Sequence, residues 1–237
     1  MIFVKRQQTF IGKTQLTMRK DNTPFDDADK NLANSRINKK RKTKTNNVKK
    51  LFSDASLVGK CLVYIGKDGN EIYDKSVIYI TESSKDKVRG IMINKLLFGT
   101  AALECHTKEK NRIMRDVYED LYQGGPESPA HGYVLFPKSD EVPDDPYAEV
   151  HGDIAVSTSF GVLQDILDGE GPKKKIIAMG HCEWHKGELE WEIYNNQWLI
   201  IPSDIDLMFD TAYEDRWGKA QMMGGMDMRA ITQVGLA

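Results

Sequence analysis

The sequence predicts an α/β fold in a single domain over residues 51–237, preceded by a disordered basic tail over residues 1–50. A chain of 237 residues with 40% hydrophobic content is long enough to bury a core. Short β-branched runs alternate with amphipathic stretches along residues 51–237. The charge is also divided, because residues 1–50 hold 14 Lys and Arg against 4 Asp and Glu, whereas the remaining 187 residues hold 19 against 31.

The tail is rich in Lys, Asn, Thr and Gln and poor in aliphatic periodicity, so it cannot bury enough apolar surface to offset the entropy of ordering. Its sharpest feature is the run RINKKRKTKTNNVKK. The cations of this run are Arg36, Lys39, Lys40, Arg41, Lys42, Lys44, Lys49 and Lys50. They could neutralise nucleic-acid phosphates. A solvated tail, or one that meets the acidic face of its own domain, is the alternative.

Composition also bounds the class of protein. No apolar run approaches the roughly 20 residues of a membrane helix, and the N-terminus lacks the apolar core of a secretory signal. The three cysteines, Cys61, Cys105 and Cys182, are scattered and form no CxxC pair. We therefore expect a soluble, cytoplasmic protein with reduced thiols and no membrane partner.

The first half of the domain shows strand patterns. Apolar or β-branched runs at residues 57–65, 76–81 and 90–93 predict three strands, and the polar turn between the last two predicts a hairpin. Charged residues surround an apolar stripe at helical spacing over residues 107–118, which predicts a surface helix. Cys105 and His106 are adjacent, so on an extended segment they would point to opposite faces.

A Gly-Gly-Pro loop follows within residues 121–136, before another strand. Gly124 and Gly125 permit close approach of a backbone or a ligand, and Pro126 stiffens the loop. An anion-binding nest of backbone N–H groups and a plain tight connection are the two interpretations. Residues 139–147, with two prolines among acidic residues, predict an exposed loop.

A strand, a helix and a second strand come next. Residues 154–157 predict the first strand, and Thr158 and Ser159 predict the N-cap of a helix that runs to Asp168. Its expected buried stripe is Val162, Leu163, Ile166 and Leu167. The near-continuous apolar run at residues 176–180 is typical of a strand covered on both faces.

The segment from Lys175 to Pro202 is the densest packing signal in the chain. After the strand we expect a polar turn over residues 181–186, a helix that opens at Glu188, and a second apolar run. Leu189 and Ile193 form the predicted buried stripe of the helix, with Glu190 and Glu192 outward. The tryptophans Trp184, Trp191, Trp198 and Trp217 favour core packing over a ligand groove.

The last predicted helix opens with a capping box of Thr211 and Glu214 and ends at Gly224 and Gly225. It is expected to pack Trp217 and Ala220. The methionines near the C-terminus, Met222, Met223, Met226 and Met228, form an adaptable apolar surface that could serve a partner or fill gaps.

Potential ligands gather at His181, Cys182, Glu183 and His185. Zinc accepts His and Cys together, and a cysteine nucleophile needs a neighbouring base. However, His181 and Cys182 at a strand end would face opposite ways, and no Asn or Asp partner is identifiable by spacing. We therefore expect a structural or surface role, with no metal and no cofactor.

The order and wording of the motifs resemble the YqgE/AlgH family. The matching pieces are KSVIYI (75–80), GIMIN (90–94), YQGGPESPAHGYVLF (122–136), VSTS (156–159), GEGPKKKIIAMG (169–180), GELEWEIYNNQWL (187–199) and FDTAYEDRWGKA (209–220). The resemblance covers roughly residues 54–237. It implies a mixed sheet that curls into an irregular barrel-like core with helices outside. Members of the family are commonly labelled transcriptional regulators, so the resemblance implies a regulatory role without an established reaction or cofactor.

The chain departs from the family pattern in three places. Gly161 stands where the family usually has Asp, at the third position after Thr158. The family's GYAGW appears as Gly180-His181-Cys182-Glu183-Trp184. The basic tail lies outside the family domain altogether.

These observations favour a non-enzymatic regulatory or adaptor protein that binds a protein partner. One alternative is a nucleic-acid-binding protein that acts through the basic tail. Another is an enzyme with a site near Gly124–Pro129 and the segment His181–His185. The candidate ligand or partner surface consists of Gly124, Gly125, Pro126, His181, Cys182, Glu183 and His185.

Overall fold

The structure is a computed structural model that describes residues 57–67, 69–103, 117–139, 148–185 and 187–225, with the backbone alone at 98–103 and 117–118. The strands are β1 (Lys60–Tyr64), β2 (Val77–Ser83), β3 (Lys87–Met92), β4 (Leu96–Leu103), β5 (Val117–Gln123), β6 (Glu127–Pro137), β7 (Glu149–His151), β8 (Ile154–Ser157), β9 (Ile176–His185) and β10 (Trp198–Pro202). The helices are α2 (Phe160–Asp168), α3 (Glu188–Tyr194) and α4 (Tyr213–Met223), with a π-helical turn η1 (Asp206–Asp210). Within the described ranges no helix has the length and apolar character needed to cross a membrane.

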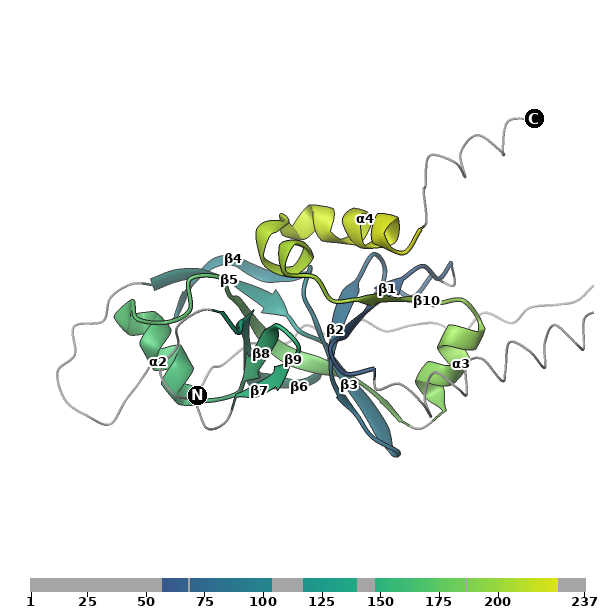
Figure 1. The fold of residues 1–237 in the computed structure, drawn as a ribbon, viewed down its shortest axis with the longest axis horizontal. Coiled ribbons are helices and arrows are strands. Elements are labelled where there is room, and N and C mark those ends of the chain that lie inside the picture. Colours follow the sequence, from purple (N-terminus) through teal and green to yellow (C-terminus); the bar gives the residue numbers. More distant parts are fainter. Residues whose placement is uncertain (1–56, 68, 104–116, 140–147, 186, 226–237) are drawn as a thin grey trace, which may run out of the picture. The chain divides into compact units, whose positions relative to one another are not determined.

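The strands form one mixed sheet that curls into a half-barrel, with the helices outside it (Figure 1). Its order is β10-β1-β2-β3-β9-β6-β8-β7, with β4 and β5 off this path. Neighbouring strands run antiparallel, except that β5 runs parallel to β9. The predicted α/β fold with a curled sheet is therefore confirmed.

Strand β9 joins the two parts of the sheet. Its first half pairs with β5 and β6, and its second half pairs with β3. Gly180, at the junction, has a φ of +75°, a conformation that side chains rarely adopt. A left-handed residue inside a strand bends it and changes which side chains share a face.

The change of face is visible in the packing. Ile176 and Ala178 join the hydrophobic cluster that η1 and α4 cover, here called the α4-side cluster. Cys182 and Trp184 join the cluster on the opposite face, here called the α3-side cluster because Leu189 and Ile193 of α3 complete it. Even-numbered residues of β9 therefore switch faces at Gly180. A regular strand would have kept them on one face.

The Gly-Gly-Pro loop packs directly against this bend. The N–H of Gly124 donates to the Met179 carbonyl at 2.8 Å, and the Gly124 carbonyl accepts from the N–H of Met92 at 2.7 Å. A methyl group built on Gly124 would overlap the Gly180 carbonyl, and one on Gly125 would overlap the backbone of His181. The loop is thus a close backbone crossing, which favours the tight connection over the anion-binding nest at Gly124, since its N–H is already bound.

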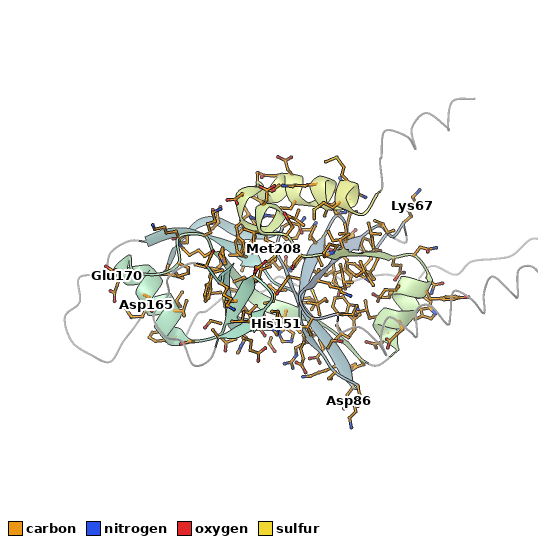
Figure 2. The ribbon with its side chains drawn as sticks, viewed as in Figure 1. Lys67, Asp86, His151, Asp165, Glu170 and Met208 are labelled. Atoms are coloured by element: carbon orange, nitrogen blue, oxygen red, sulfur yellow. The ribbon has the colours of Figure 1, made fainter. Side chains whose placement is uncertain are left out.

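The face of the sheet under α4 is fastened by a buried arginine. Arg216 is 5% exposed, and its Nη1 donates to the Ile93 carbonyl while Nε donates to the Thr211 carbonyl at 3.0 Å. The guanidinium carbon also lies 5.3 Å from the ring centroid of Tyr122. Burial lowers the pKa of Arg216. The carbonyl and ring partners thus compensate for the burial of the Arg216 guanidinium. Met208 of η1, labelled in Figure 2, is buried in the hydrophobic cluster on this face.

Most of the predicted elements are present. The three predicted N-terminal strands are β1, β2 and β3, and the last two form an antiparallel hairpin. Ser159 caps α2 by accepting from the N–H of Gly161 at 3.0 Å, and α2 ends at Gly169. Because Ser159 is the cap, Gly161 is the second residue of the helix and not the third. The helix α3 begins at Glu188 and buries Leu189 and Ile193 as predicted.

Several expectations differ from the structure or fall outside it. The polar turn over residues 181–186 is wrong, because β9 continues to His185. The capping box is also wrong, since Ala212 precedes α4 and the Thr211 hydroxyl donates to the Asp206 carbonyl at 2.7 Å. The predicted helix at 107–118 lies outside the described residues except for Val117 and Tyr118, which begin β5. The basic tail, Cys105, His106, most of the 139–147 loop, Met226 and Met228 also lie outside them, so the tail and its boundary stay predictions.

Replacement of Gly180 by Ala should destabilise the domain strongly. A left-handed alanine costs about 1–2 kcal/mol, and the added methyl group would also press on the Gly125 carbonyl. We expect the free energy of unfolding, measured by urea denaturation, to fall by about 3 kcal/mol or more.

The matched control is Gly152→Ala. Gly152 also has a positive φ, of +67°, but no atom lies within 4 Å of the built methyl group. This control should lose only about 1–2 kcal/mol. Equal losses in the two variants would show that the crossing at Gly180 is not under steric constraint.

Candidate functional site

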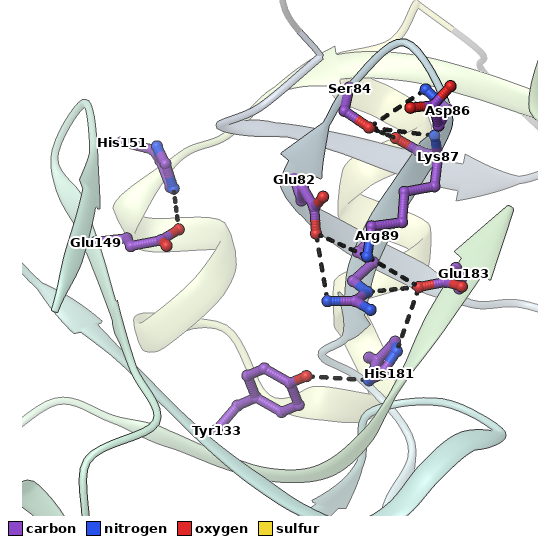
Figure 3. A network of polar contacts seen from close by, with 10 residues as sticks. All are labelled: Glu82, Ser84, Asp86, Lys87, Arg89, Tyr133, Glu149, His151, His181 and Glu183. Atoms are coloured by element: carbon purple, nitrogen blue, oxygen red, sulfur yellow. Dashed lines mark hydrogen bonds and ion pairs between the residues drawn. The ribbon is translucent and has the colours of Figure 1, made fainter. Parts of the chain in front are cut away.

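A polar network lies where the β2–β3 hairpin meets β6 and β9 (Figure 3). It consists of Glu82, Lys87, Arg89, Tyr133, His181 and Glu183, here called the rim network. These residues come from the β2–β3 hairpin and from two strands that are distant from it in sequence, β6 and β9. Their side chains are half-buried, except for His181, which is buried, and Glu82, which is slightly more open.

Two irregularities in the backbone place these side chains on one face. Ile80 pairs with Gly90 but Glu82 pairs with Arg89, so Thr81 is the extra residue of a β-bulge. The bulge turns Glu82 toward the face that carries Arg89. On β9, the bend at Gly180 does the same for residues 181 and 183. The rim network therefore depends on departures from regular strand alternation.

Arg89 is the centre of the charged part. Arg89 and Glu183 are directly opposite each other on β3 and β9, and Arg89 Nε lies 2.5 Å from Glu183 Oε2. Arg89 Nη1 lies 3.3 Å from Glu82 Oε2, and Lys87 Nζ lies 3.6 and 3.7 Å from the same oxygens of Glu82 and Glu183. The hydrogen bond from Arg89 lowers the pKa of Glu183. Glu183 is therefore an ionised, neutralised carboxylate at pH 7.

His181 forms the buried part of the network. It is 6% exposed, its Nδ1 lies 3.0 Å from the Tyr133 hydroxyl, and its Nε2 lies 3.9 Å from Glu183 Oε2. Burial, followed by the positive charge of Arg89, lowers the pKa of His181. The ring is therefore neutral at pH 7. The tautomer that fits both contacts carries its proton on Nε2 and accepts the Tyr133 hydroxyl proton at Nδ1.

Cys182 points away from the rim network. It is buried in the α3-side cluster, and its Sγ lies 3.5 Å from the Gly124 carbonyl oxygen. Burial raises the pKa of the Cys182 thiol, and burial also raises the pKa of Cys61 to about 12. Both thiols are therefore protonated at pH 7 and are poor nucleophiles. Among the described residues, no three His, Cys, Asp or Glu side chains converge as a metal site.

A groove lies on the other side of Glu183, between the end of β9 and α3. Its volume is about 550 Å³, and it is lined by Tyr73, Glu183, Trp184, Gly187, Glu188, Trp191 and Glu192. It is here called the α3 groove. Glu183 belongs to both the rim network and the α3 groove, so Arg89 fixes one wall of the groove from behind.

Glu192 anchors α3 to the sheet. Its Oε2 accepts from the indole N–H groups of Trp184 at 3.0 Å and of Trp198 at 2.6 Å. The prediction that Glu192 points outward is therefore wrong. The reason is that both buried indoles need an acceptor, and Glu192 is within reach of the strand on each side.

Trp191 differs from the other tryptophans. It is 61% exposed at the edge of the α3 groove, so its predicted core position is wrong. Trp184 and Trp198 are buried, and Trp217 is half-buried with its N–H bonded to the Tyr64 carbonyl at 2.8 Å. The core prediction thus holds for Trp184 and Trp198, and Trp217 packs against the core.

The structure brings the two predicted segments of the candidate surface together. Gly124 and Gly125 are buried against Gly180 and His181, while Pro126 is exposed beside them. His185 is exposed at the end of β9, separate from His181, and Glu183 is half-buried. The accessible members of the predicted surface are therefore Pro126, Glu183 and His185. The eight predicted phosphate-binding cations lie outside the described residues.

A second hollow, of about 630 Å³, lies between the β7–β8 turn and the end of β10. Its lining includes both a cationic side chain, Lys60, and the carboxylates of Asp153 and Asp204. Asp204 already has a partner, since its Oδ1 accepts from the N–H of Leu207 at 2.8 Å. This arrangement selects no particular ligand charge.

Sequence reasoning missed Arg89, Tyr133 and Glu82. Arg89 is separated from Glu183 by 94 residues, and only the antiparallel pairing of β3 with β9 places them opposite each other. The usable signal was the basic residue in the hairpin strand, beside an apolar stripe, which implies a nearby carboxylate.

The pKa of His181 should lie below 6.5 in an NMR titration of the folded chain. Because the unfolded pKa is higher, the neutral ring stabilises the fold above pH 6.5, and this stability is lost as the pH falls through the folded-state value. Arg89→Gln should raise the His181 pKa by removing a positive charge. Lys85→Gln, in the exposed turn, should leave it unchanged. A His181 pKa at or above 6.5 would contradict this assignment.

Comparison with known proteins identifies the family to which the chain is related. The family model described as AlgH-like matches residues 62–229. A UPF0301 protein from Polaromonas sp. is 33% identical over 162 residues, which cover 66% of this chain and 83% of the relative. A UPF0301 protein from Pseudoalteromonas translucida is 30% identical over 182 residues, which cover 75% of this chain and 96% of the relative.

A solved structure agrees with the sequence matches. The solution structure of the AlgH protein from Pseudomonas aeruginosa superposes with a TM-score of 0.62 at 29% identity and covers 76% of this chain and 95% of that one. The span matched by the family model, residues 62–229, includes the residues of the rim network and of the α3 groove. The chain therefore belongs to the AlgH-like family.

Proposed function

We propose that the chain is a non-enzymatic regulatory or adaptor protein that binds a macromolecular partner through the α3 groove. The observation that carries the proposal is the position of Trp191, which is 61% exposed at the edge of a groove of about 550 Å³. Tryptophan is enriched where proteins bind partners, because it supplies a large apolar contact with a polar handle.

The chemistry of the described residues supports binding over catalysis. A covalent nucleophile needs an activated thiolate or hydroxyl with a base in contact. Cys61 and Cys182 are buried thiols whose pKa is raised, and His181 already contacts Tyr133. Glu183 is held by Arg89. His181, Glu183, Arg89 and Tyr133 contact one another, which fits a role in holding the site in shape.

The location of the protein is part of the proposal. The three cysteines form no paired set in the sequence, and Cys61 and Cys182 are free in the structure. Such usage fits a cytoplasmic protein. The names of the relatives specify no reaction, which is compatible with the proposal and adds no substrate.

Site-specific crosslinking tests this function. A photoreactive phenylalanine analogue placed at position 191 of the full chain should yield one defined crosslinked product in the source cells. The control is the same analogue at Phe160, which is 55% exposed but lies on α2, away from the groove. The absence of a product from position 191, or the same products from both positions, would contradict partner binding at the groove.

A second function is proposed for the tail, from the observation that residues 1–50 carry a net charge of +10 beside a remainder of −12. Closely spaced cations bind phosphates and release counterions, which makes the affinity depend strongly on salt. The tail is therefore a candidate contact for nucleic acid, independent of the α3 groove.

Neutralisation of four tail cations tests this second function. The full chain with Lys39, Lys40, Arg41 and Lys42 changed to Gln should bind labelled duplex DNA more weakly, with a slope of log affinity against log salt reduced by about 3 to 4. The charge-matched control changes four exposed lysines to Gln, namely Lys67, Lys85, Lys138 and Lys173. Equal effects of the two sets would refute a specific role for the tail.

A further inference from the structure

We infer that the α3 groove binds a cationic side chain of the partner, the guanidinium or ammonium group of an Arg or Lys. This inference rests on the proposed function and names the chemistry that the groove would recognise. It follows from three features of the lining: its uncompensated charge, its aromatic rings and its fixed geometry.

The charge of the groove is negative. Glu183, Glu188 and Glu192 line it, and no Lys, Arg or His is among the described lining residues. Arg89 and Lys87 neutralise Glu183 from outside the groove. The bonds to Glu192 come from uncharged indoles, and the bond to Glu188 comes from the backbone N–H of His185 at 2.7 Å. Glu188 and Glu192 therefore have no cationic partner among the residues that the structure describes, which favours a bound cation over an anion.

The aromatic rings select an organic cation. Trp191, which is 61% exposed, is the ring that a ligand can reach. Tyr73 and Trp184 also line the groove, but they are stacked on each other, with centroids 5.9 Å apart and an interplanar angle of 26°. The indole face of Trp191 attracts a guanidinium or ammonium group, and a guanidinium can also stack on it. The carboxylates do not group as a metal site in the described part of the chain, so an inorganic cation lacks a set of ligands.

The geometry of the groove is set before binding. Glu192 is held by two indole donors, and Leu189 and Ile193 lock α3 onto the sheet. Arg89 holds Glu183 in place. A site whose charged and aromatic groups are already ordered loses less conformational entropy on binding. Trp191 and Glu188 are the exposed side chains of the described lining, and Glu188 is held on one oxygen by the N–H of His185.

Fluorescence anisotropy with a defined probe tests the inference. The probe is a fluorescein-labelled Gly-Ser peptide with three spaced arginines, and its counterpart carries citrulline, the neutral isostere, at the same positions. The full chain should bind the arginine peptide and should bind the citrulline peptide at least about 10-fold more weakly. Equal binding of the two peptides, or no binding of the arginine peptide, would overturn the inference.

Variants locate the binding in the groove. Trp191→Ala and Glu188→Gln should each raise the Kd of the arginine peptide about 3- to 5-fold. The matched controls are Phe160→Ala and Glu170→Gln, which remove an exposed ring and an exposed carboxylate at α2 (Figures 1 and 2). These controls should change the Kd less than about 2-fold. Equal shifts in all four variants would mean that the acidic domain attracts the peptide without a site.

The two proposals can fail separately. A crosslinked partner at position 191 together with no preference for arginine over citrulline would retain partner binding and remove the cationic chemistry. Specific arginine binding without a crosslinked product in cells would retain the groove's chemistry and remove the adaptor function. Urea denaturation of each variant confirms that a lost affinity is not a lost fold, since both altered groove residues are exposed.

Discussion

The close crossing of the Gly124–Gly125 backbone over Gly180 and His181 is the constraint on which the rest of the structure depends. No side chain fits at Gly124, at Gly125 or at Gly180, because each would overlap the opposite backbone. The crossing brings β5 and β6 onto the first half of β9 and leaves the second half to β3. A single strand thus belongs to both parts of the curled sheet, and the half-barrel is held at this point by backbone hydrogen bonds.

The bend at Gly180 also places the side chains of residues 181–184 on two different faces of the sheet. His181 and Glu183 turn toward Arg89 and Tyr133, while Cys182 and Trp184 pack beneath α3. The rim network and the α3 groove are therefore two sides of one strand. Glu183 is shared between them, and the hydrogen bond from Arg89 that lowers its pKa also sets its position in the groove. The network is in this sense a support for the groove.

The sequence was sufficient to predict most of the individual strands and helices, but it was insufficient to predict how the strands pair in the sheet. Alternating and helical periodicities predicted β1, β2, β3, β8, α2 and α3, because burial of one face depends on residues near in sequence. Glycine often ends a strand, so the sequence predicts that the strand stops at Gly180. The continuation of β9 to His185 depends on its pairing with β3, β5 and β6, which are distant in sequence. Glu192 and Trp191 were assigned to the wrong environments, because the i, i+4 stripe of α3 describes one face and not the strands that approach its sides. A cross-strand pair such as Arg89 and Glu183 can be predicted only when the order and pairing of the strands are known.

The bend also explains why the potential ligands of this segment do not form one site. His181, Cys182 and Glu183 fall on alternate faces, so they cannot form one cluster of ligands. His181 and Glu183 add a buried imidazole and an ionised carboxylate to the rim, and both have partners there. Cys182 lies under the Gly124 carbonyl, where its sulfur packs in the α3-side cluster. Glu183 is half-buried and accepts a hydrogen bond from Arg89, so loss of Arg89 would leave this carboxylate without that donor. Among the described lining residues, Glu188 and Glu192 then remain as the carboxylates without a cationic partner, and this is the feature on which the proposed preference for a cationic ligand rests.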